Sequence, residues 1–110
     1  MNLLFVCTNN RMRSATAQQI YEEDERYTVK SAGIAPDAMV PLSASLLEWA
    51  DSIVVMEKRH RNWIRKRFPH IYATKKIVCL YIPDEYDNMQ SELIDLIRSR
   101  FENVYQHGLV

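Results

Sequence analysis

Residues 3–14 read Leu-Leu-Phe-Val-Cys-Thr-Asn-Asn-Arg-Met-Arg-Ser, an apolar run that ends in a cysteine and continues into a polar loop. The uninterrupted apolar run over 3–6 is typical of a parallel strand that is covered on both faces. A stretch of helical character follows over 14–25. A strand, a short loop and a helix in this order predict the first half of a β-α-β unit, with Cys7 at the carboxyl end of its strand.

The rest of the chain continues this alternation. The predicted strands are apolar and rich in β-branched or aromatic residues, and they span 3–6, 27–29, 53–56 and 77–82. The predicted helices span 14–25, 43–50, 58–68 and 91–105. Pro36 and Pro41 bracket a loop, Pro69 ends the third helix and Pro83 ends the fourth strand. The alternation predicts an α/β fold, a three-layer sandwich with a four-stranded parallel sheet.

Composition limits the class of protein. The 110 residues fit a single domain over 1–110, and 47% hydrophobic with 25% charged residues is ordinary for a globular protein. The formal net charge is zero, so we expect neither a nucleic acid nor a membrane as partner. No apolar stretch approaches the roughly 20 residues of a membrane helix, and no secretory leader is visible. We therefore expect a cytoplasmic protein whose two cysteines are free thiols.

The polar loop after Cys7 has the features of an anion-binding cradle. Its backbone N–H groups can turn inward, and the helix behind it adds unsatisfied N–H groups and the positive end of a dipole. The same field favours the thiolate of Cys7, which is the nucleophilic form. The planar guanidinium of Arg13 can hold two oxygens of one phosphoryl group. This segment therefore predicts a phosphate-binding loop after the first strand.

The segment from Cys7 to Ser14 resembles the Cys-x5-Arg-Ser loop of the low-molecular-weight protein tyrosine phosphatases. Three further stretches, at 31–33, 50–56 and 83–86, resemble that family in the same order, so the resemblance spans most of the chain. It implies a phosphomonoester hydrolase, in particular a protein tyrosine phosphatase, that forms a phosphocysteine without a metal or another cofactor. The implied ligands are a phosphotyrosine protein or a small aryl phosphate, with inorganic phosphate or sulfate in the loop.

The resemblance also implies a role for individual residues. The implied catalytic residues are the nucleophile, the charge-stabilising arginine and the general acid: Cys7, Arg13 and Asp84. Ser14 would donate a hydrogen bond to the thiolate, Asn10 would tie the loop into shape, and Ser31 would anchor it from a neighbouring strand. The implied substrate-binding residues are Thr8, Asn9, Asn10, Arg11, Met12, Ser14 and Tyr86.

The chain departs from the family pattern at several positions. Asn9 replaces a glycine, and asparagine tolerates the left-handed backbone that such a turn needs. Met12 replaces a second cysteine that could cap an oxidised nucleophile. Glu85 replaces the proline after the general acid, and Arg11 introduces a cation that could bind a more acidic substrate. The segment 34–49 is shorter than in the family, where it helps to wall the pocket.

Other interpretations of these residues remain open. Ser14 could be only a helix N-cap, and Asp87 matches Asp84 as a candidate acid on spacing alone. A phosphoryl carrier, or a phospholigand-binding module with little hydrolysis, could use the same scaffold. Arsenate reduction needs further cysteines, and the remaining one, Cys79, is predicted to lie in the core. Arg13 together with Asp84 favours hydrolysis.

One stretch outside the motif is strongly basic. Residues 58–67 contain six Lys and Arg side chains and no acidic one. A solvated helix face is the favoured interpretation, a docking patch for acidic partners comes second, and nucleic-acid binding comes last because no base-reading motif accompanies the charge. Histidines and Asp51 show no metal-ligand spacing, and no chemistry is predicted for Asp51, His60, His70 or His107.

Overall fold

The computed structural model describes all 110 residues and contains one parallel sheet of four strands, in the order β2-β1-β3-β4. The strands are β1 (Asn2–Cys7), β2 (Thr28–Gly33), β3 (Ser52–Val55) and β4 (Lys76–Cys79). The helices are α1 (Arg13–Tyr21), α2 (Ala44–Trp49), α3 (Lys58–Arg67), α4 (Pro69–Thr74) and α5 (Ser91–Gln106). The predicted α/β class and the parallel sheet are confirmed.

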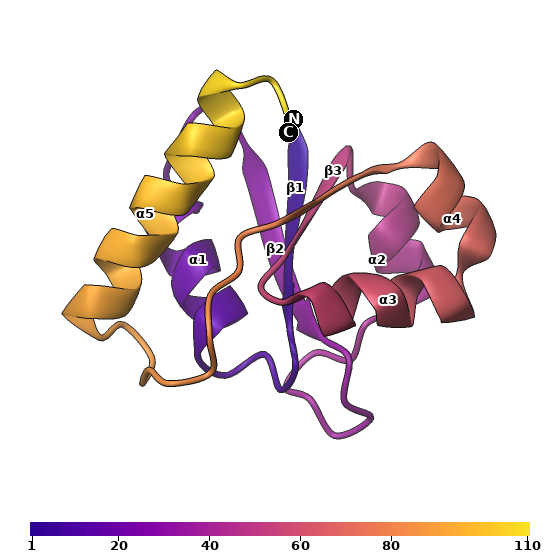
Figure 1. Ribbon diagram of the computed structural model, residues 1–110, viewed down its shortest axis with the longest axis horizontal. Coiled ribbons are helices and arrows are strands. Elements are labelled where there is room, and N and C mark those ends of the chain that lie inside the picture. The colour runs from indigo at the N-terminus through magenta and orange to yellow at the C-terminus, as the bar shows by residue number, and fades with distance from the viewer.

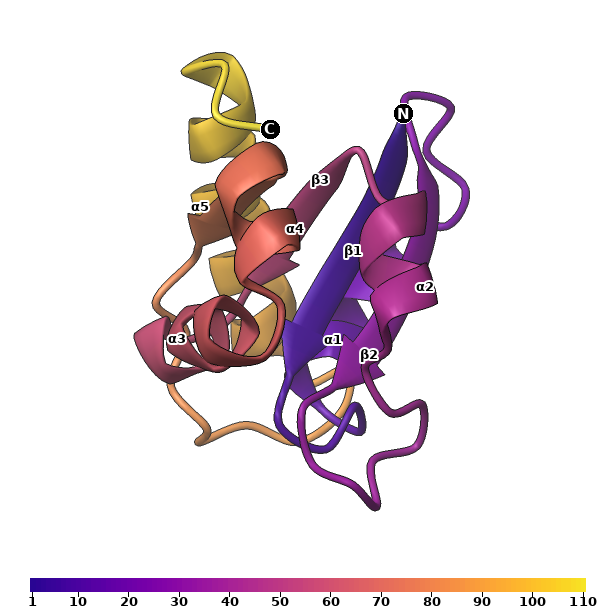
Figure 2. The ribbon, with the colours of Figure 1, turned by 90° about the vertical axis from the view of Figure 1, so that its right-hand side faces the viewer.

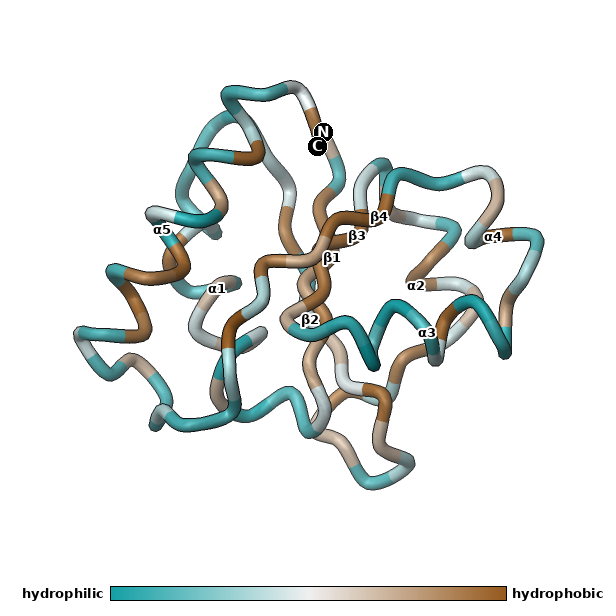
Figure 3. Tube along the Cα trace, viewed as in Figure 1, coloured by the Kyte–Doolittle hydropathy of each residue, from teal (hydrophilic) through white to brown (hydrophobic).

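The sheet separates two helical layers (Figures 1 and 2). Helices α1 and α5 cover one face, and α2, α3 and α4 cover the other. Side chains alternate along β1, so that Leu3 and Phe5 join the first core while Leu4 and Val6 join the second. These four side chains are fully buried. Burial on both faces explains why β1 is apolar, and Figure 3 shows this strand in brown.

An aromatic cluster joins α5 to the sheet. Phe101 is fully buried, and its ring lies 5.7 Å from that of Phe5, 4.8 Å from that of Tyr21 and 5.6 Å from that of Tyr27. Aromatic pairs at such separations add to the stability that comes from burial alone. These contacts fix α5 over the first core, and they thereby also hold the end of the connection between β4 and α5.

The fourth strand is shorter than predicted. Pairing ends at Cys79, because Tyr81 adopts a left-handed backbone with φ of 55°. The chain nevertheless continues beside β3, since Leu80 N donates to Val55 O at 2.9 Å and Ile82 N donates to Met56 O at 2.8 Å. This path delivers residues 83–84 to the carboxyl ends of β1 and β3.

Two other elements have an end that differs from the prediction by more than one residue, and one helix was not predicted. Strand β2 runs from Thr28 to Gly33, beyond the predicted 27–29, because its last three residues pair with the apolar end of β1. Helix α1 ends at Tyr21, four residues before the predicted end. Helix α4 was not predicted: Pro69 ends α3 but also occupies the first turn of α4, where a missing N–H costs nothing.

Gly33 lets the loop after β1 pack closely on β2. A Cβ atom at this position would lie 2.4 Å from Thr8 O and 2.9 Å from Asn10 N. Such contacts are far inside van der Waals distance, so any larger residue would displace the loop. The glycine therefore allows the cysteine-containing loop to lie against the neighbouring strand.

Candidate active site

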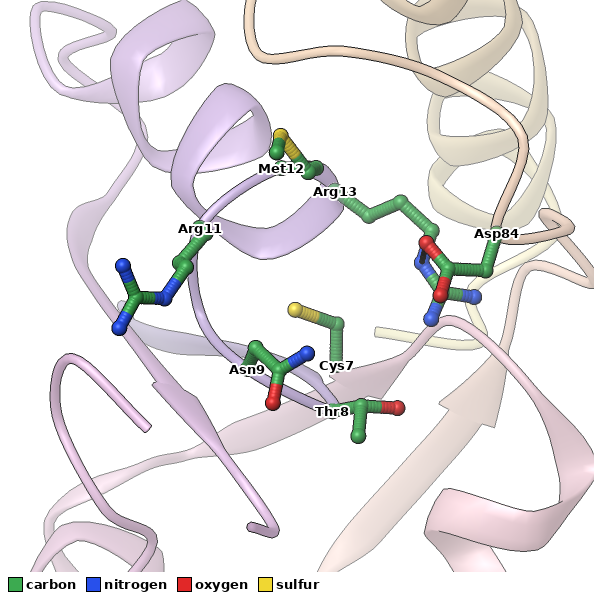
Figure 4. Close-up of a pocket in the computed structure, with 7 residues that line it drawn as sticks. All are labelled: Cys7, Thr8, Asn9, Arg11, Met12, Arg13 and Asp84. Atoms are coloured by element: carbon green, nitrogen blue, oxygen red, sulfur yellow. Dashed lines mark ion pairs between the residues drawn. The ribbon is translucent and has the colours of Figure 1, made fainter. Parts of the chain in front are cut away.

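A cavity of about 200 Å³ opens at the carboxyl edge of the sheet (Figure 4). Ligands of open parallel sheets bind at this edge. The lining residues come from the 7–14 loop and from the segment after β4, and they are Cys7, Thr8, Asn9, Arg11, Met12, Arg13 and Asp84. The structure thus brings the three predicted catalytic residues to one cavity.

Two hydrogen bonds hold the Cys7 sulfur. Asn10 N donates to Sγ at 3.2 Å, and the hydroxyl of Ser14 lies 2.9 Å from Sγ. Asn10 Nδ2 donates to Ser14 Oγ at 2.8 Å, so this oxygen acts as an acceptor toward the loop amide. Its own hydrogen is then directed to the sulfur, which is closer than the alternative acceptor, Ala32 O at 3.4 Å. Both donors stabilise a thiolate.

Asn10 provides the backbone turn that the loop requires. Its φ is 57°, in the left-handed region that asparagine tolerates better than most residues. The expectation that Asn9 would take this conformation is wrong, because no positive φ occurs there. The N-cap of α1 is Met12, so Ser14 lies inside the first turn and the N-cap interpretation of Ser14 is also wrong.

Arg13 is buried and oriented by two acceptors. Its Nη1 donates to Glu57 Oε2 at 2.5 Å and to Ile82 O at 2.8 Å, while the residue is only 1% exposed. These bonds use both Nη1 hydrogens. The Nε–H and Nη2–H groups make no hydrogen bond within the protein and remain available to an anion beside Cys7.

Glu57 orients Arg13, a role that the sequence did not predict. Its carboxylate also accepts from Arg59 Nη2 at 3.0 Å. Burial acts to raise the pKa of Glu57, but the hydrogen bonds from Arg13 and Arg59 outweigh it and hold this pKa below its ordinary value. A signal existed in the sequence, because Glu57 follows the third strand closely and therefore lies at the same sheet edge as Cys7.

His60 supports the loop through Thr8, although no chemistry was predicted for it. Glu57 N donates to His60 Nδ1 at 3.0 Å, so Nδ1 carries no hydrogen. Burial, with the charges of Arg13 and Arg59, lowers the pKa of His60 to about 3. The neutral ring therefore has its hydrogen on Nε2, which donates to Thr8 Oγ1 at 3.0 Å.

The Thr8 hydroxyl becomes a donor toward the cavity. Its oxygen accepts from His60 Nε2 and also from Arg59 Nη2, at 2.7 Å. A hydroxyl oxygen has two lone pairs, and both are used here. Its hydrogen is free, and Thr8 lines the cavity. The tautomer of His60 thus makes the Thr8 hydroxyl a hydrogen-bond donor toward the cavity.

The structure distinguishes the two candidate acids. Asp84 lines the cavity with its side chain 58% exposed, and its Oδ1 lies 3.9 Å from Arg13 Nε. Asp87 does not line the cavity; it lies at the turn before α5, where its backbone N–H donates to Gln90 Oε1 at 3.0 Å. Asp84 is therefore the carboxyl group near the sulfur and guanidinium.

Four predicted site residues do not line the cavity: Asn10 and Ser14, which bond the Cys7 sulfur, and Ser31 and Tyr86. Ser31 is buried in β2 and donates its hydroxyl to Gln18 of α1, so it supports the helix behind the loop rather than the loop itself. Tyr86 is half-buried and packs against the first core, and it is not among the lining residues. A direct bond from the Ser31 hydroxyl to the loop is therefore not seen, and the substrate contact of Tyr86 stays a prediction.

The second thiol and the metal-binding side chains are separate from this cavity. Cys79 is buried in the second core, where burial raises the pKa of its thiol. Clusters of three or more His, Cys, Asp or Glu side chains suited to a metal ion do not occur. Among the helices, none combines the length and apolarity that crossing a membrane requires.

Comparison with known proteins supports the fold. No family model matches the chain, and no curated protein matches it. Solved structures match over nearly its full length. YwlE arginine phosphatase from Geobacillus stearothermophilus is 24% identical with a TM-score of 0.68, over 97% of this chain and 94% of that one. SP-PTP, a low-molecular-weight protein tyrosine phosphatase from Streptococcus pyogenes, is 15% identical with a TM-score of 0.79, over 96% and 91%.

A third match was solved with a ligand. Wzb from Vibrio vulnificus, in complex with benzylphosphonate, is 21% identical with a TM-score of 0.72, over 98% of this chain and 96% of that one. This chain therefore has the fold of these phosphatases, and the fold that the 7–14 loop implied is confirmed.

Proposed function

We propose that this chain is a phosphomonoester hydrolase, a protein tyrosine phosphatase that acts through a phosphocysteine on Cys7. One observation carries the proposal: a single cavity contains the doubly hydrogen-bonded Cys7 sulfur, free N–H groups of Arg13 and the carboxyl group of Asp84. The likeness to solved phosphatases supports the same class of reaction. A phosphoryl carrier would need neither the arginine nor the acid, so hydrolysis is favoured over that alternative.

In the first step the Cys7 thiolate attacks phosphorus, and the bond from phosphorus to the leaving oxygen breaks. Asp84 gives its proton to that oxygen, so the alcohol or phenol leaves neutral. The Nε–H and Nη2–H groups of Arg13 and the loop amides stabilise the charge on the three equatorial oxygens. Glu57 keeps the guanidinium aimed at them.

In the second step a water molecule attacks the phosphocysteine. The Asp84 carboxylate takes a proton from this water, the oxygen bonds to phosphorus, and the sulfur–phosphorus bond breaks. The electron pair returns to Cys7 as thiolate, which the hydroxyl of Ser14 and Asn10 N stabilise. Inorganic phosphate leaves and Asp84 is again protonated.

The cavity favours an aryl phosphate over phosphoarginine. Arg11 lines the cavity, and its cation would repel the guanidinium of a phosphoarginine substrate. The related Wzb holds benzylphosphonate, an aryl-bearing phosphonate. We therefore assign phosphotyrosine as the substrate group, despite the likeness to an arginine phosphatase.

A steady-state assay tests the proposal. The protein should hydrolyse 4-nitrophenyl phosphate, keep its activity in a metal chelator, and act on phosphotyrosine in preference to free phosphoarginine. Cys7→Ser should abolish turnover while phosphate or sulfate still binds, because the cradle of N–H groups survives. Full activity of Cys7→Ser would disprove the phosphocysteine mechanism, and a preference for phosphoarginine would overturn the substrate assignment.

A further inference from the structure

We propose that the cationic side chains of α3 form a docking surface for an acidic segment that flanks the phosphorylated residue of a protein substrate. This inference rests on the proposed function and names its substrate class. The surface, called here the α3 cationic face, consists of Lys58, Arg59, Arg61, Arg65 and Lys66, whereas Arg67 lies on the other side of the helix, over the Trp63 ring. The helix has no acidic residue and is among the most hydrophilic stretches of the chain (Figure 3).

These charges are not neutralised within the protein. Of the five, only Arg59 has a carboxylate within 4 Å, and that carboxylate, Glu57, is already shared with Arg13. Arg26 on the opposite layer differs, since it pairs with both Asp24 and Glu102. The α3 cationic face therefore presents excess positive charge to solvent, although the whole chain has a net charge of zero.

Part of the charge arrangement is unfavourable for the helix, although Arg65 and Lys66 lie in the last turn, where the helix dipole favours cations. Lys58 and Arg61 are three residues apart, and Arg61 and Arg65 are four apart, so like charges are neighbours on the helix surface. Lys58 and Arg59 also lie in the first turn, at the positive end of the helix dipole. A partner of opposite charge would relieve both kinds of repulsion. A solvated face explains the exposure of these side chains but not this arrangement.

The surface begins at the wall of the active site. Arg59 donates to the cavity-lining Thr8. Lys58 lines a second, shallow hollow of about 410 Å³ together with Glu57, Tyr81, Ile82 and Pro83. This hollow adjoins the catalytic cavity, because Glu57 binds Arg13 and Pro83 precedes Asp84. A peptide leaving the cavity over Pro83 therefore meets the exposed Tyr81 ring and then Lys58.

The dimensions set the spacing of the acidic residues. Lys58 and Arg65 are seven residues apart, which is about 10 Å along a helix axis. An extended peptide covers that distance in about three residues. We therefore expect two carboxylates about three residues apart in the peptide to contact Lys58 and Arg65 together. An acidic protein segment fits better than nucleic acid, because the cavity at the start of this path is proposed to take a phosphorylated side chain.

The test compares two phosphotyrosine peptides that differ only in having Asp and Glu or Asn and Gln at the flanking positions. At low ionic strength the protein should prefer the acidic peptide in kcat/KM by about ten-fold, and salt near 0.3 M should remove most of the preference. Arg65→Glu should reverse or abolish it. Arg98→Glu, an equal charge change on exposed α5, is the matched control and should leave it intact.

Both variants should hydrolyse 4-nitrophenyl phosphate like the unmodified protein, since neither residue lines the cavity. An unchanged peptide preference in Arg65→Glu would overturn the docking surface while leaving the phosphatase proposal standing. If 4-nitrophenyl phosphate is not hydrolysed at all, the proposed function fails; the docking claim is then decided by fluorescence anisotropy of the two peptides on Cys7→Ser. Equal binding of both peptides would contradict the proposal. So would tight binding of a single-stranded oligonucleotide, if Arg65→Glu abolishes that binding and leaves peptide binding unchanged.

Discussion

At the scale of single residues, the site depends on how hydrogen-bond donors are distributed. Asn10 gives its side-chain amide to Ser14, and this frees the Ser14 hydrogen for Cys7. Glu57 accepts a hydrogen bond from Nη1 of Arg13, and this leaves the Nε–H and Nη2–H groups for the substrate. Asp84 lies beside the Nε–H group but makes no hydrogen bond to it, which suits a group that must exchange protons with the substrate.

Asp84→Asn tests the role of the acid. Removing a general acid should lower the rate of phosphorylation by about 10² to 10⁴ for phenyl or alkyl phosphates. The loss should be small for strongly electron-withdrawn aryl phosphates, because their leaving group is stable without a proton. Single-turnover kinetics with a series of leaving groups measures this dependence.

Asp87→Asn is the matched control, since Asp87 lies outside the cavity. It should show no dependence on the leaving group. A uniform loss for Asp84→Asn, or a graded loss for Asp87→Asn, would move the general acid away from Asp84.

At the scale of secondary structure elements, α3 supports the 7–14 loop through its first turn. Glu57 N donates to His60 Nδ1, and His60 N donates to the carbonyl oxygen of Glu57, so the two residues close the first turn. Their side chains reach Arg13 and Thr8, so one helix start orients two residues of the cavity. The sequence indicates that this helix begins near Lys58, but the contact between His60 and Thr8 joins residues 52 positions apart and depends on how α3 packs on the sheet.

His60 should make the stability of the fold depend on pH. Its pKa is about 3 when folded and about 6.5 when unfolded, so between these two pH values the unfolded state binds the proton and the folded state does not. Stability is then complete above the unfolded pKa and falls as pH falls, by about 2 kcal/mol at pH 5. Urea unfolding between pH 7 and pH 5 measures this loss.

His60→Gln should remove most of this pH dependence, whereas His70→Gln should not, because His70 is exposed. Gln can still donate to Thr8, so the variant separates the proton effect from the lost contact. Equal slopes for the unmodified protein and His60→Gln would contradict the assignment of His60 as buried and neutral.

At the scale of the whole molecule, the strand order decides which residues can meet. The strand alternation in the sequence predicts a parallel sheet, but periodicity carries no information on strand order, which is β2-β1-β3-β4. That order places Gly33 beside Cys7 and places Cys79 two strands away. The sequence could therefore identify Cys7, Arg13 and Asp84 from their motif, together with the loop partners Ser14 and Asn10, but not Glu57 and His60, which reach the loop from α3.

The products of Cys7 oxidation should depend on the separation between Cys7 and Cys79. With strands about 4.8 Å apart, β1 and β4 are about 10 Å apart, more than the roughly 7 Å between Cα atoms that a disulfide allows. Mild peroxide should therefore produce sulfenic and higher acids on Cys7 without an intramolecular disulfide, since Met12 offers no second thiol in the loop. Peptide mapping by mass spectrometry reports both products.

Cys79→Ser should be inactivated by peroxide at the same rate as the unmodified protein, because Cys79 is buried in the second core. Protection of activity by Cys79, or a disulfide between Cys7 and Cys79, would show that the sheet opens enough for the two sulfurs to meet.

The most direct test of the whole account is to trap the phosphoryl group on the protein. Asp84→Asn should still accept phosphate from a strongly electron-withdrawn aryl phosphate but hydrolyse the intermediate slowly, because no carboxylate is left to activate water. A rapid denaturing quench followed by peptide mapping should then find phosphate on the Cys7 sulfur, and none in Cys7→Ala treated alike. Turnover of the substrate with no phosphate on Cys7, or with phosphate on another residue, would contradict the account.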